Sequence, residues 1–262
     1  DLIILSNPNI DIPTIFIWPE GVLSAVDLKN ILQYKNLFIK SFSEKHLIIL
    51  GINDAVVTNN GQLKVYNSLA VIDKNLDVKN LYYKNKLVPF GEFLPLENYL
   101  KQFGLRSITN DYQSFSNGEK RKVIDIKNEY FSFNFLPLIC YEIIYSGKLF
   151  DSSNFDFIIN ISEDGWFGDS VGQYQHFTHS IYRAIEEGKD VIRSANNGIT
   201  AHIDGNGLVI KQIESTQSGV IEITEFKKIK PTIFSKIGNK MFFYLLLIYI
   251  SFVFFINKQG IK

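Results

Sequence analysis

Three residues whose side chains together could transfer an acyl group lie at or just beyond the ends of predicted strands. Glu20 follows the run IFIWP, Lys84 lies within YYKNKLVPFGE, and Cys140 ends the run FNFLPLIC. Functional groups of α/β domains gather at such strand ends. A thiol becomes a useful nucleophile when a base takes its proton or a cation stabilises its thiolate. In this chemistry Cys140 attacks a carbonyl, Glu20 accepts the thiol proton, and Lys84 stabilises the developing oxyanion.

Residue types alone leave a structural role open for each of the three. A single cysteine at a strand end is usually a small buried hydrophobe. Glu20 could cap a helix that follows it, and Lys84 could be a solvated surface lysine. The three residues lie far apart in the sequence, so only the tertiary fold can bring them together.

Short apolar runs alternate with helical patterns along the chain and predict the elements that must position these residues. The runs are rich in β-branched residues and end at polar or turn residues, which is typical of buried strands. Predicted strands cover residues 15–18, 46–50, 68–72, 133–139, 157–161, 200–204, 208–213 and 219–223. Predicted helices cover residues 24–41, with Ser24 as the N-cap, and 174–187. This alternation predicts an α/β layered domain whose sheets are covered on both faces.

The composition excludes several classes of protein. With 262 residues, 46% of them hydrophobic, the chain can bury a sizeable core, so disorder and low complexity are excluded. The formal net charge of zero argues against a nucleic-acid partner. Cys140 is the single cysteine, which forbids an internal disulfide and, with four scattered His, leaves little for a zinc site. The polar stretch 96–120 is the longest loop-like segment, and such loops are often lids or binding loops.

The chain ends in an apolar run, residues 241–256, that carries no charge and precedes the polar tail NKQGIK. A helix of this length spans about 24 Å, slightly short of the roughly 30 Å hydrocarbon core of a bilayer. Because the run is apolar all round, it favours a membrane helix at about 241–257 over a buried core helix. Lysines are more frequent before the run than after it, which taken alone places the main domain on the cytoplasmic side.

The rest of the chain shows no internal repeat and no Pro- or Ser-rich linker. We therefore predict one catalytic domain over residues 1–230, and a linker, the membrane helix and a short tail over residues 231–262. Met241 is the only methionine and residue 1 is Asp, so we expect the domain to lack an upstream part.

Several long motifs resemble the nitrilase, or carbon-nitrogen hydrolase, superfamily. They are WPE at 18–20, YYKNKLVPFGE at 82–92, PLICYE at 137–142, and NISEDGWFGDS followed by QH, RA and RSANNGIT. The extended LVPFGE after the lysine and the apolar tail resemble, more narrowly, the apolipoprotein N-acyltransferase family. This resemblance implies a nitrilase-like four-layer α-β-β-α sandwich with a C-terminal transmembrane helix.

The resemblance also assigns roles to residues. Matched position by position, the catalytic residues of the family fall on Glu20, Lys84 and Cys140. Its supporting or substrate-binding positions fall on Glu92, Tyr141 and Glu142, and Trp166 and Phe167 could line an acyl pocket near the nucleophile.

The implied reaction is a ping-pong acyl transfer at the bacterial inner membrane, with the catalytic domain facing the periplasm. Cys140 takes a fatty acyl chain from a phospholipid as a thioester, and the N-terminal amine of a diacylglyceryl-modified apolipoprotein then attacks it. The implied partners are lipid, lipoprotein and membrane, with no nucleic acid, no metal and no other cofactor. The periplasmic orientation runs against the local lysine bias, and we follow the resemblance because a last helix seldom sets topology.

Three departures from the family pattern bear on these expectations. Glu163 stands where the family often has Asn, and an extra carboxylate there could raise the pKa of a neighbouring carboxyl group or be harmless if it faces solvent. Lys86 stands where His is frequent, and we interpret it as a surface lysine. The bundle of membrane helices that precedes the catalytic domain in the family is absent from this sequence, so the chain could be a fragment or come from a split or decayed gene.

Two other functions stay open. A soluble nitrilase-like amidase would hydrolyse a small amide through the same three residues, with the apolar tail in the core or in an oligomer interface. A catalytically silent remnant would survive as a folded binding module. Membrane partitioning distinguishes the amidase from the acyltransferase. Acylation of Cys140 by phospholipid distinguishes the acyltransferase, which should gain the acyl group, from the silent remnant, which should not.

Overall fold

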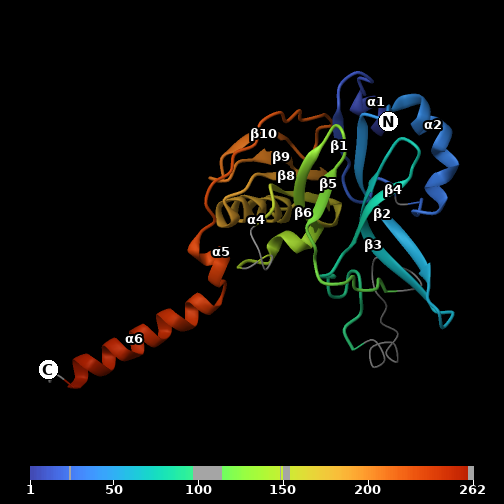
Figure 1. Cartoon of the computed structure of the whole chain (residues 1–262). Coiled ribbons are helices and arrows are strands. Elements are labelled where there is room, and N and C mark those ends of the chain that lie inside the picture. Colours follow the sequence, from blue (N-terminus) through green and yellow to red (C-terminus); the bar gives the residue numbers. More distant parts are fainter. Residues whose placement is uncertain (24, 97–113, 148, 150–153, 259–262) are drawn as a thin grey trace.

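Two β-sheets face each other in the computed structural model, which describes residues 1–23, 25–96, 114–147, 149 and 154–258 (Figure 1). The first sheet has the order β1-β2-β3-β4 and the second the order β10-β9-β8-β7-β6-β5. The first sheet consists of β1 (Thr14–Ile17), β2 (His46–Val57), β3 (Leu63–Ile72) and β4 (Val78–Tyr83). The second consists of β5 (Ile124–Lys127), β6 (Ser132–Ile139), β7 (Phe157–Glu163), β8 (Val191–Asn196), β9 (Thr200–Ile203) and β10 (Val209–Ile213).

The described residues also form helices beside the sheets and one long helix at the C-terminal end. They are α1 (Leu2–Ser6), η1 (Asn30–Tyr34), α2 (Lys35–Ser41), η3 (Cys140–Ile144), η4 (Gly165–Phe167), α4 (Gly172–Glu187), α5 (Ile233–Ile237) and α6 (Lys240–Lys258), where η marks a 3-10 helix.

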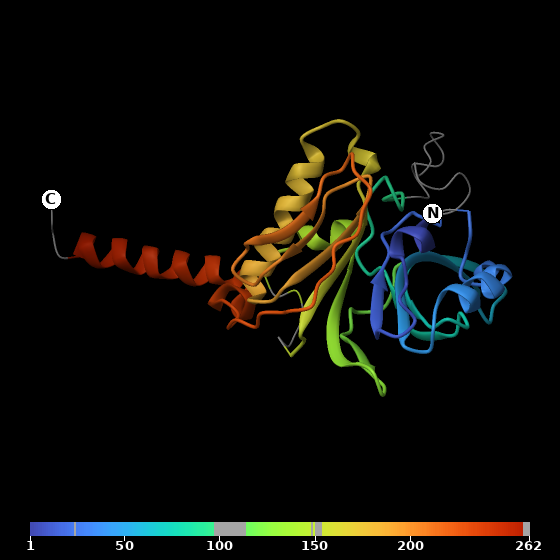
Figure 2. The ribbon, with the colours of Figure 1, turned by 90° about the horizontal axis from the view of Figure 1, so that it is seen from above.

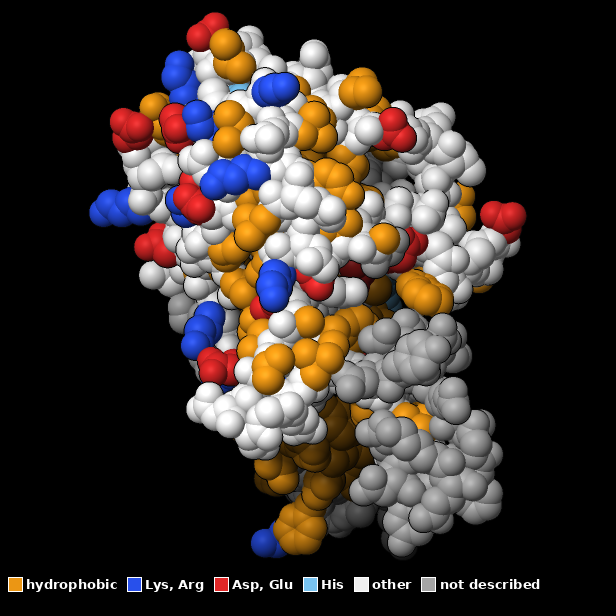
Figure 3. All heavy atoms as spheres, turned by 90° about the vertical axis from the view of Figure 1, so that its right-hand side faces the viewer, with side chains coloured by type: hydrophobic (Ala, Val, Ile, Leu, Met, Phe, Trp, Pro, Cys, Tyr) orange, Lys and Arg blue, Asp and Glu red, His pale blue; other side chains and the backbone are white. Residues whose placement is uncertain are grey.

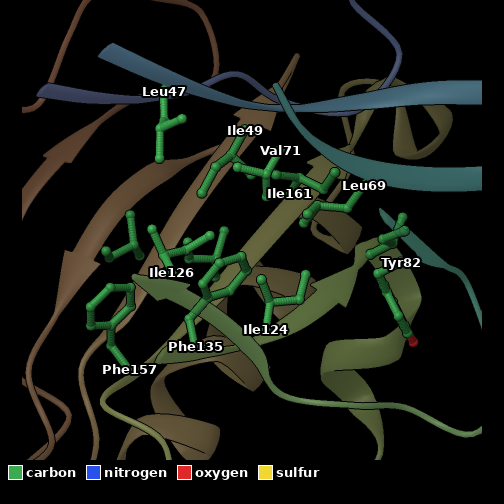
Figure 4. Close-up of a cluster of buried hydrophobic side chains, with 13 residues drawn as sticks. Leu47, Ile49, Leu69, Val71, Tyr82, Ile124, Ile126, Phe135, Phe157 and Ile161 are labelled. Atoms are coloured by element: carbon green, nitrogen blue, oxygen red, sulfur yellow. The ribbon is translucent and has the colours of Figure 1, made fainter. Parts of the chain in front are cut away.

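Alternating side chains of the strands build the layers. The cluster between the sheets includes Leu47, Ile49, Leu69, Val71, Phe135, Phe157 and Ile161 (Figure 4). In β2 the intervening Ile48 and Leu50 point the other way and pack with Phe38 of α2. In β7, Ile158 packs with Phe177 of α4. The described chain therefore stacks α2, the first sheet, the second sheet and α4, which confirms the predicted α-β-β-α sandwich (Figure 2).

The central strands of the second sheet end at a common edge. β6 and β7 run parallel with Ile139 opposite Ile161, and β7 and β8 run parallel with Glu163 opposite Asn196. The carboxyl ends of parallel strands open onto one side of a sheet, where the following loops carry functional groups. Cys140 lies at this edge, because it directly follows the last residue of β6.

Most predicted strands are confirmed, but two predicted elements are wrong. The strand predicted at 219–223 has no ladder; its carbonyl at Glu222 instead accepts from Nζ of Lys211 at 2.7 Å. The helix predicted at 24–41 begins only at Asn30, because Asp27 bridges to Asn53 of β2 and holds the preceding residues against the first sheet. The predicted cap Ser24 and most of the predicted loop at 96–120 lie outside the described residues.

The C-terminal helix α6 leads away from both sheets (Figures 1 and 2). In the part of the chain that the structure describes, it is the one helix long and apolar enough to cross a membrane, with a mean hydropathy of 1.9. None of its residues is buried, so α6 is not a core helix of this domain. The domain itself mixes apolar and charged side chains on the face shown in Figure 3.

Candidate active site

Glu20 lies in the turn that follows β1. The N–H of Trp18 donates to the carbonyl of Ile49 at 2.8 Å, which extends the pairing of β1 with β2 up to this turn. A Cβ atom at Gly51 of β2 would lie 2.7 Å from the Cα atom of Glu20, closer than van der Waals contact allows. Glycine at position 51 therefore lets the turn that carries Glu20 pack directly against β2.

Lys84 follows β4 directly, and its N–H donates to the carbonyl of Asn67 at 2.9 Å. Its side chain is 1% exposed, and its Nζ lies 2.8 Å from Oε1 of Glu92 and 3.8 Å from Oε1 of Glu20. Removing an ammonium group from water is costly unless carboxylates compensate it. The two glutamates therefore supply the partners that a buried, charged lysine requires.

Cys140 is the first residue of η3 and has a φ of 49°, in the left-handed region. A residue that carries a Cβ atom is less stable by about 1–2 kcal/mol in this conformation. In α/β-hydrolases, a sharp turn from a strand into a helix exposes the nucleophile at the edge of the sheet. Cys140 as a residue is half-buried, and its side chain packs against the cluster between the sheets.

The backbone of Glu163, at the end of β7, contacts both Cys140 and Glu20. Its N–H donates to Oε2 of Glu20 at 2.9 Å, and its carbonyl oxygen lies 4.0 Å from Sγ of Cys140. The N–H and C=O groups of one residue in a strand point to the same side. The structure thus brings Glu20 and Cys140 to one side of β7, and the ion pair with Lys84 adds the third side chain.

The charges of these groups act on one another. Burial raises the pKa of the Cys140 thiol to about 12, the charge of Glu20 adds to this rise, and the charge of Lys84 opposes it. Burial also raises the pKa of Glu20, against the charge of Lys84. For Lys84, burial is outweighed by the charges of Glu20 and Cys140, so its pKa is raised. Because the thiol of Cys140 is protonated at rest, it must lose its proton as the sulfur attacks, and Glu20, whose raised pKa makes it a stronger base, is the group that could accept it.

Asn67 of β3 connects two of the carboxylates, and the sequence reasoning missed it. Its Nδ2 donates to Oε1 of Glu20 at 2.6 Å and to Oε1 of Glu92 at 2.8 Å. Oε2 of Glu92 accepts from the N–H of Val88 at 2.9 Å, so both oxygens of this glutamate are held. The available signal was strand alternation, which places Asn67 on the same face as Leu69, between the sheets.

Glu142 is fully buried and joins the segment after Lys84 to the end of β6. Its Oε1 accepts from the N–H groups of Asn85 at 3.0 Å and Lys86 at 3.1 Å, and its Oε2 accepts from the N–H of Ile139 at 3.0 Å. Both carboxylate oxygens of Glu142 thus accept backbone N–H groups and tie the two segments together.

The three aromatic candidates lie close in sequence to the site but differ in exposure. Tyr141 is half-buried, and its ring lies 6.1 Å from that of Tyr145. Phe167 is half-buried with its ring 5.4 Å from the ring of His176, whereas Trp166 is 65% exposed. An acyl pocket that uses Trp166 would have to cover a side chain that now faces solvent.

The two unusual residues of the motifs have ordinary structural roles. Oε1 of the Glu163 carboxylate accepts from the N–H of Gly165 at 2.8 Å, and its Oε2 lies beside Gly21, where a Cβ atom would meet it at 2.7 Å. The hydrogen bond to Glu20 comes from the backbone N–H of Glu163. Lys86 has an exposed side chain, as a surface lysine should.

Paired sheets between helical layers, with a cysteine at the carboxyl end of a central strand, are the architecture of the carbon-nitrogen hydrolases. The family model described as "Carbon-nitrogen hydrolase" matches residues 36–225, more than half of the sequence, so this chain belongs to that family.

Within the family, the chain is similar to proteins named apolipoprotein N-acyltransferase. The protein of Rickettsia prowazekii is 35% identical over 235 residues, which cover 89% of this chain and 46% of that protein. The protein of Wigglesworthia glossinidia brevipalpis is 34% identical over 264 residues, which cover 95% of this chain and 50% of that protein. The protein of Brucella melitensis is 32% identical over 212 residues, which cover 80% of this chain and 39% of that protein. The resemblance seen in the motifs is confirmed, and the chain spans half or less of the length of these relatives.

Solved structures share the fold. The glutamine-dependent NAD+ synthetase of Acinetobacter baumannii is 16% identical with a TM-score of 0.52, and the match covers 76% of this chain and 36% of that one. A CN-hydrolase superfamily protein of Xanthomonas campestris, solved with an arsenic adduct in its active site, is 17% identical with a TM-score of 0.50. That match covers 76% of this chain and 73% of the other. At these identities the comparison concerns the fold and not the substrate.

Proposed function

We propose that this chain is the catalytic part of a phospholipid:apolipoprotein N-acyltransferase. It would transfer a fatty acyl chain through a Cys140 thioester to the N-terminal amine of a diacylglyceryl-cysteine lipoprotein. The names of the relatives support the acceptor class, and the cluster of charged and nucleophilic side chains supports the chemistry.

In the first half-reaction, Sγ of Cys140 attacks the ester carbonyl of the phospholipid while Glu20 accepts the thiol proton. Lys84 stabilises the negative charge that develops on the carbonyl oxygen. The C–O bond to the glycerol then breaks, and Glu20 returns the proton to the departing oxygen, so that a lysophospholipid leaves and the thioester remains.

In the second half-reaction, the amine of the lipoprotein attacks the thioester carbonyl. Glu20 accepts a proton from the amine, the C–S bond breaks, and the thiolate of Cys140 takes the proton back as the amide forms. Glu92 and Asn67 touch Glu20 or Lys84 and would hold them in position.

One observation carries this proposal more than any other. The backbone of Glu163 contacts both the Glu20 carboxylate and the Cys140 thiol, while the same carboxylate lies 3.8 Å from the buried Lys84 ammonium. These contacts support a shared site in which Glu20, Cys140 and Lys84 act on one acyl group.

The C-terminal helix supports a membrane location. We propose that residues 1–230 form the catalytic domain and that residues 231–262 contain a linker, a membrane anchor built on α6 and a tail. An anchor of this kind would hold the site beside its lipid substrate, in the bacterial inner membrane with the domain facing the periplasm.

Mass spectrometry of the full chain after incubation with phospholipid vesicles tests the proposal. Wild-type protein should gain one fatty-acyl mass on Cys140, the Cys140→Ala variant should gain none, and a diacylglyceryl-modified peptide should then remove the adduct. Glu20→Gln should slow adduct formation by about 10²–10⁴-fold as the loss of a general base, and Lys84→Met by about 10²–10³-fold as the loss of an oxyanion partner.

Lys86→Met is the matched control, because this lysine is exposed and lies two residues further along the chain. It should form the adduct at the wild-type rate. Folded wild-type protein that gains no acyl mass would contradict the proposal and favour a silent remnant. An adduct that water removes as fast as the peptide does would favour a hydrolase.

A further inference from the structure

The QH and RSANNGIT motifs, which the proposed reaction does not use, contribute polar side chains to one buried network. Nδ1 of His176 lies 2.9 Å from Oδ1 of Asp164, and Ser162 donates to the same oxygen at 2.7 Å. Arg193 donates from Nη2 to Oδ2 of Asp164 at 2.5 Å. All four side chains are less than one-tenth exposed. So many desolvated polar groups are stable only because they satisfy one another.

Arg193 fixes this network to the second sheet. Its Nε donates to the carbonyl of Ile199 at 3.1 Å and its Nη1 donates to Oδ1 of Asn160. The guanidinium is thus held on three sides, and Asp164 is held by it. Burial alone would raise the pKa of Asp164, but the hydrogen bond from His176 and the charge of Arg193 outweigh it and lower the pKa to about 2. The carboxylate therefore stays ionised and keeps the imidazole ring in one orientation.

The free end of that ring points at Cys140. Nε2 of His176 lies 3.3 Å from the backbone carbonyl oxygen of Cys140, the residue whose φ of 49° is in the left-handed region. Strained conformations persist only where the surroundings determine them. The network thus contacts the backbone of a residue in such a conformation.

We infer that His176 is a positioning residue in its doubly protonated form: its Nδ1–H donates to Asp164, and its Nε2–H donates to the carbonyl of Cys140 and holds the nucleophile in its left-handed turn at the edge of the sheet. Asp164 orients the ring, and Arg193 orients Asp164. The inference rests on the proposed role of Cys140 as the nucleophile. The carbonyl direction sets the peptide plane after Cys140, and with it the direction in which the thiol leaves the backbone. A displacement of the thiol by about 1 Å can lower reactivity by about 10²-fold.

Two substitutions separate this role from a merely structural one. His176→Gln keeps an amide nitrogen near the place of Nε2, so it retains a donor for the Cys140 carbonyl and loses the ring contact to Asp164. His176→Asn keeps an amide nitrogen near the place of Nδ1, so it retains the contact to Asp164 and loses the donor to Cys140. His179→Gln on the same helix is the matched control, because His179 contacts Tyr182 and not the network.

The readout is the rate at which iodoacetamide alkylates Cys140 in the full chain, followed by mass spectrometry. We expect His176→Asn to slow alkylation by about tenfold or more, while His176→Gln and His179→Gln stay within about twofold of wild type. Circular dichroism confirms that each variant is folded. Equal losses in the Asn and Gln variants, or wild-type reactivity in the Asn variant, would overturn the inference. If the Asn variant does not fold, retained reactivity in folded His176→Gln supports the inference and its loss refutes it.

A measurement on the wild-type protein is independent of any variant. The ¹⁵N chemical shifts of the His176 ring should show both nitrogens protonated, and an unprotonated Nε2 would refute the inference. Alkylation needs no lipid, so this test does not depend on the acyltransferase reaction. If wild type forms no acyl thioester but the alkylation order holds, the proposed function fails and the positioning role of His176 stands.

Discussion

Replacing Glu142 by Gln removes the charge that joins the two chain segments flanking the site. The carboxylate accepts N–H groups from Asn85 and Lys86 on one oxygen and from Ile139 on the other. Gln presents one oxygen and one NH₂ group in place of the two oxygens. In either orientation the NH₂ group faces at least one backbone N–H, and that buried donor loses its acceptor.

The expected loss of stability follows from burial and charge. A buried donor left without an acceptor destabilises a protein by about 1–3 kcal/mol. Glu142 is also the charge partner of Arg121, whose Nη2 lies 3.4 Å from Oε1 with 9% of the arginine side chain exposed. Removing one member of a buried ion pair costs about 3–5 kcal/mol, because the other charge stays desolvated. The two effects overlap, so we expect Glu142→Gln to lower the free energy of unfolding by about 3–5 kcal/mol.

Urea unfolding of the full chain in detergent measures this change through the fluorescence of Trp18, which is buried in the first layer. The control is Glu119→Gln, because the Glu119 side chain is 84% exposed and pairs only with the exposed Lys122 at 3.0 Å among the ion pairs of the described chain. The control should change the free energy of unfolding by less than about 1 kcal/mol. A change of less than about 1 kcal/mol in Glu142→Gln as well would show that its contacts do not hold the two segments together.

Three further predictions concern Glu20 and its surroundings. Burial raises the pKa of Glu20 above its ordinary value of 4.5; the charge of Lys84 opposes this rise and the charge of Glu92 adds to it. Because the ionised form acts as the base, thioester formation should be present above the raised pKa and lost as the pH falls through it. A pH-rate profile whose acid limb lies at the ordinary value would contradict this. Gly51→Ala should lower the free energy of unfolding by about 1–3 kcal/mol, measured by chemical denaturation, and slow thioester formation, because its Cβ atom would meet the Glu20 backbone at 2.7 Å. An unchanged free energy of unfolding and an unchanged rate would refute the close packing. Glu163→Gln should lower stability by about 1 kcal/mol, because three donors face its carboxylate. Thioester formation should stay within about twofold of wild type, since the hydrogen bond to Glu20 comes from the Glu163 backbone, which the substitution keeps. A loss comparable to that of Glu20→Gln would show that the carboxylate takes part.

The strands were predictable where their side chains face two apolar layers. Residues 47–50 and 157–159 are continuous apolar runs, and both lie within strands that contact the cluster between the sheets and a helix. The run 219–223 has the same local character, but no neighbouring strand pairs with it among the described residues. The local sequence pattern shows whether a segment is able to form a strand, whereas actual strand pairing depends on whether a sheet edge lies next to that segment in the fold.

The site was predictable only in part, for the same reason. Glu20, Lys84 and Cys140 could be named from motifs, and strand alternation could have added Asn67. The contact of His176 with the Cys140 carbonyl had no local signal, because it joins a helix to a turn that lies 36 residues away in the sequence.

The sequence by itself determined the chemical groups, the apolar alternation that builds facing sheets, and the apolar C-terminal helix. These are properties of residue type and period, which act over a few neighbouring residues. The tertiary structure decided which groups meet. The ends of β1, β4, β6 and β7 converge because the sheets pack face to face and β6 and β7 run parallel, and that register brings the backbone of Glu163 to both Glu20 and Cys140.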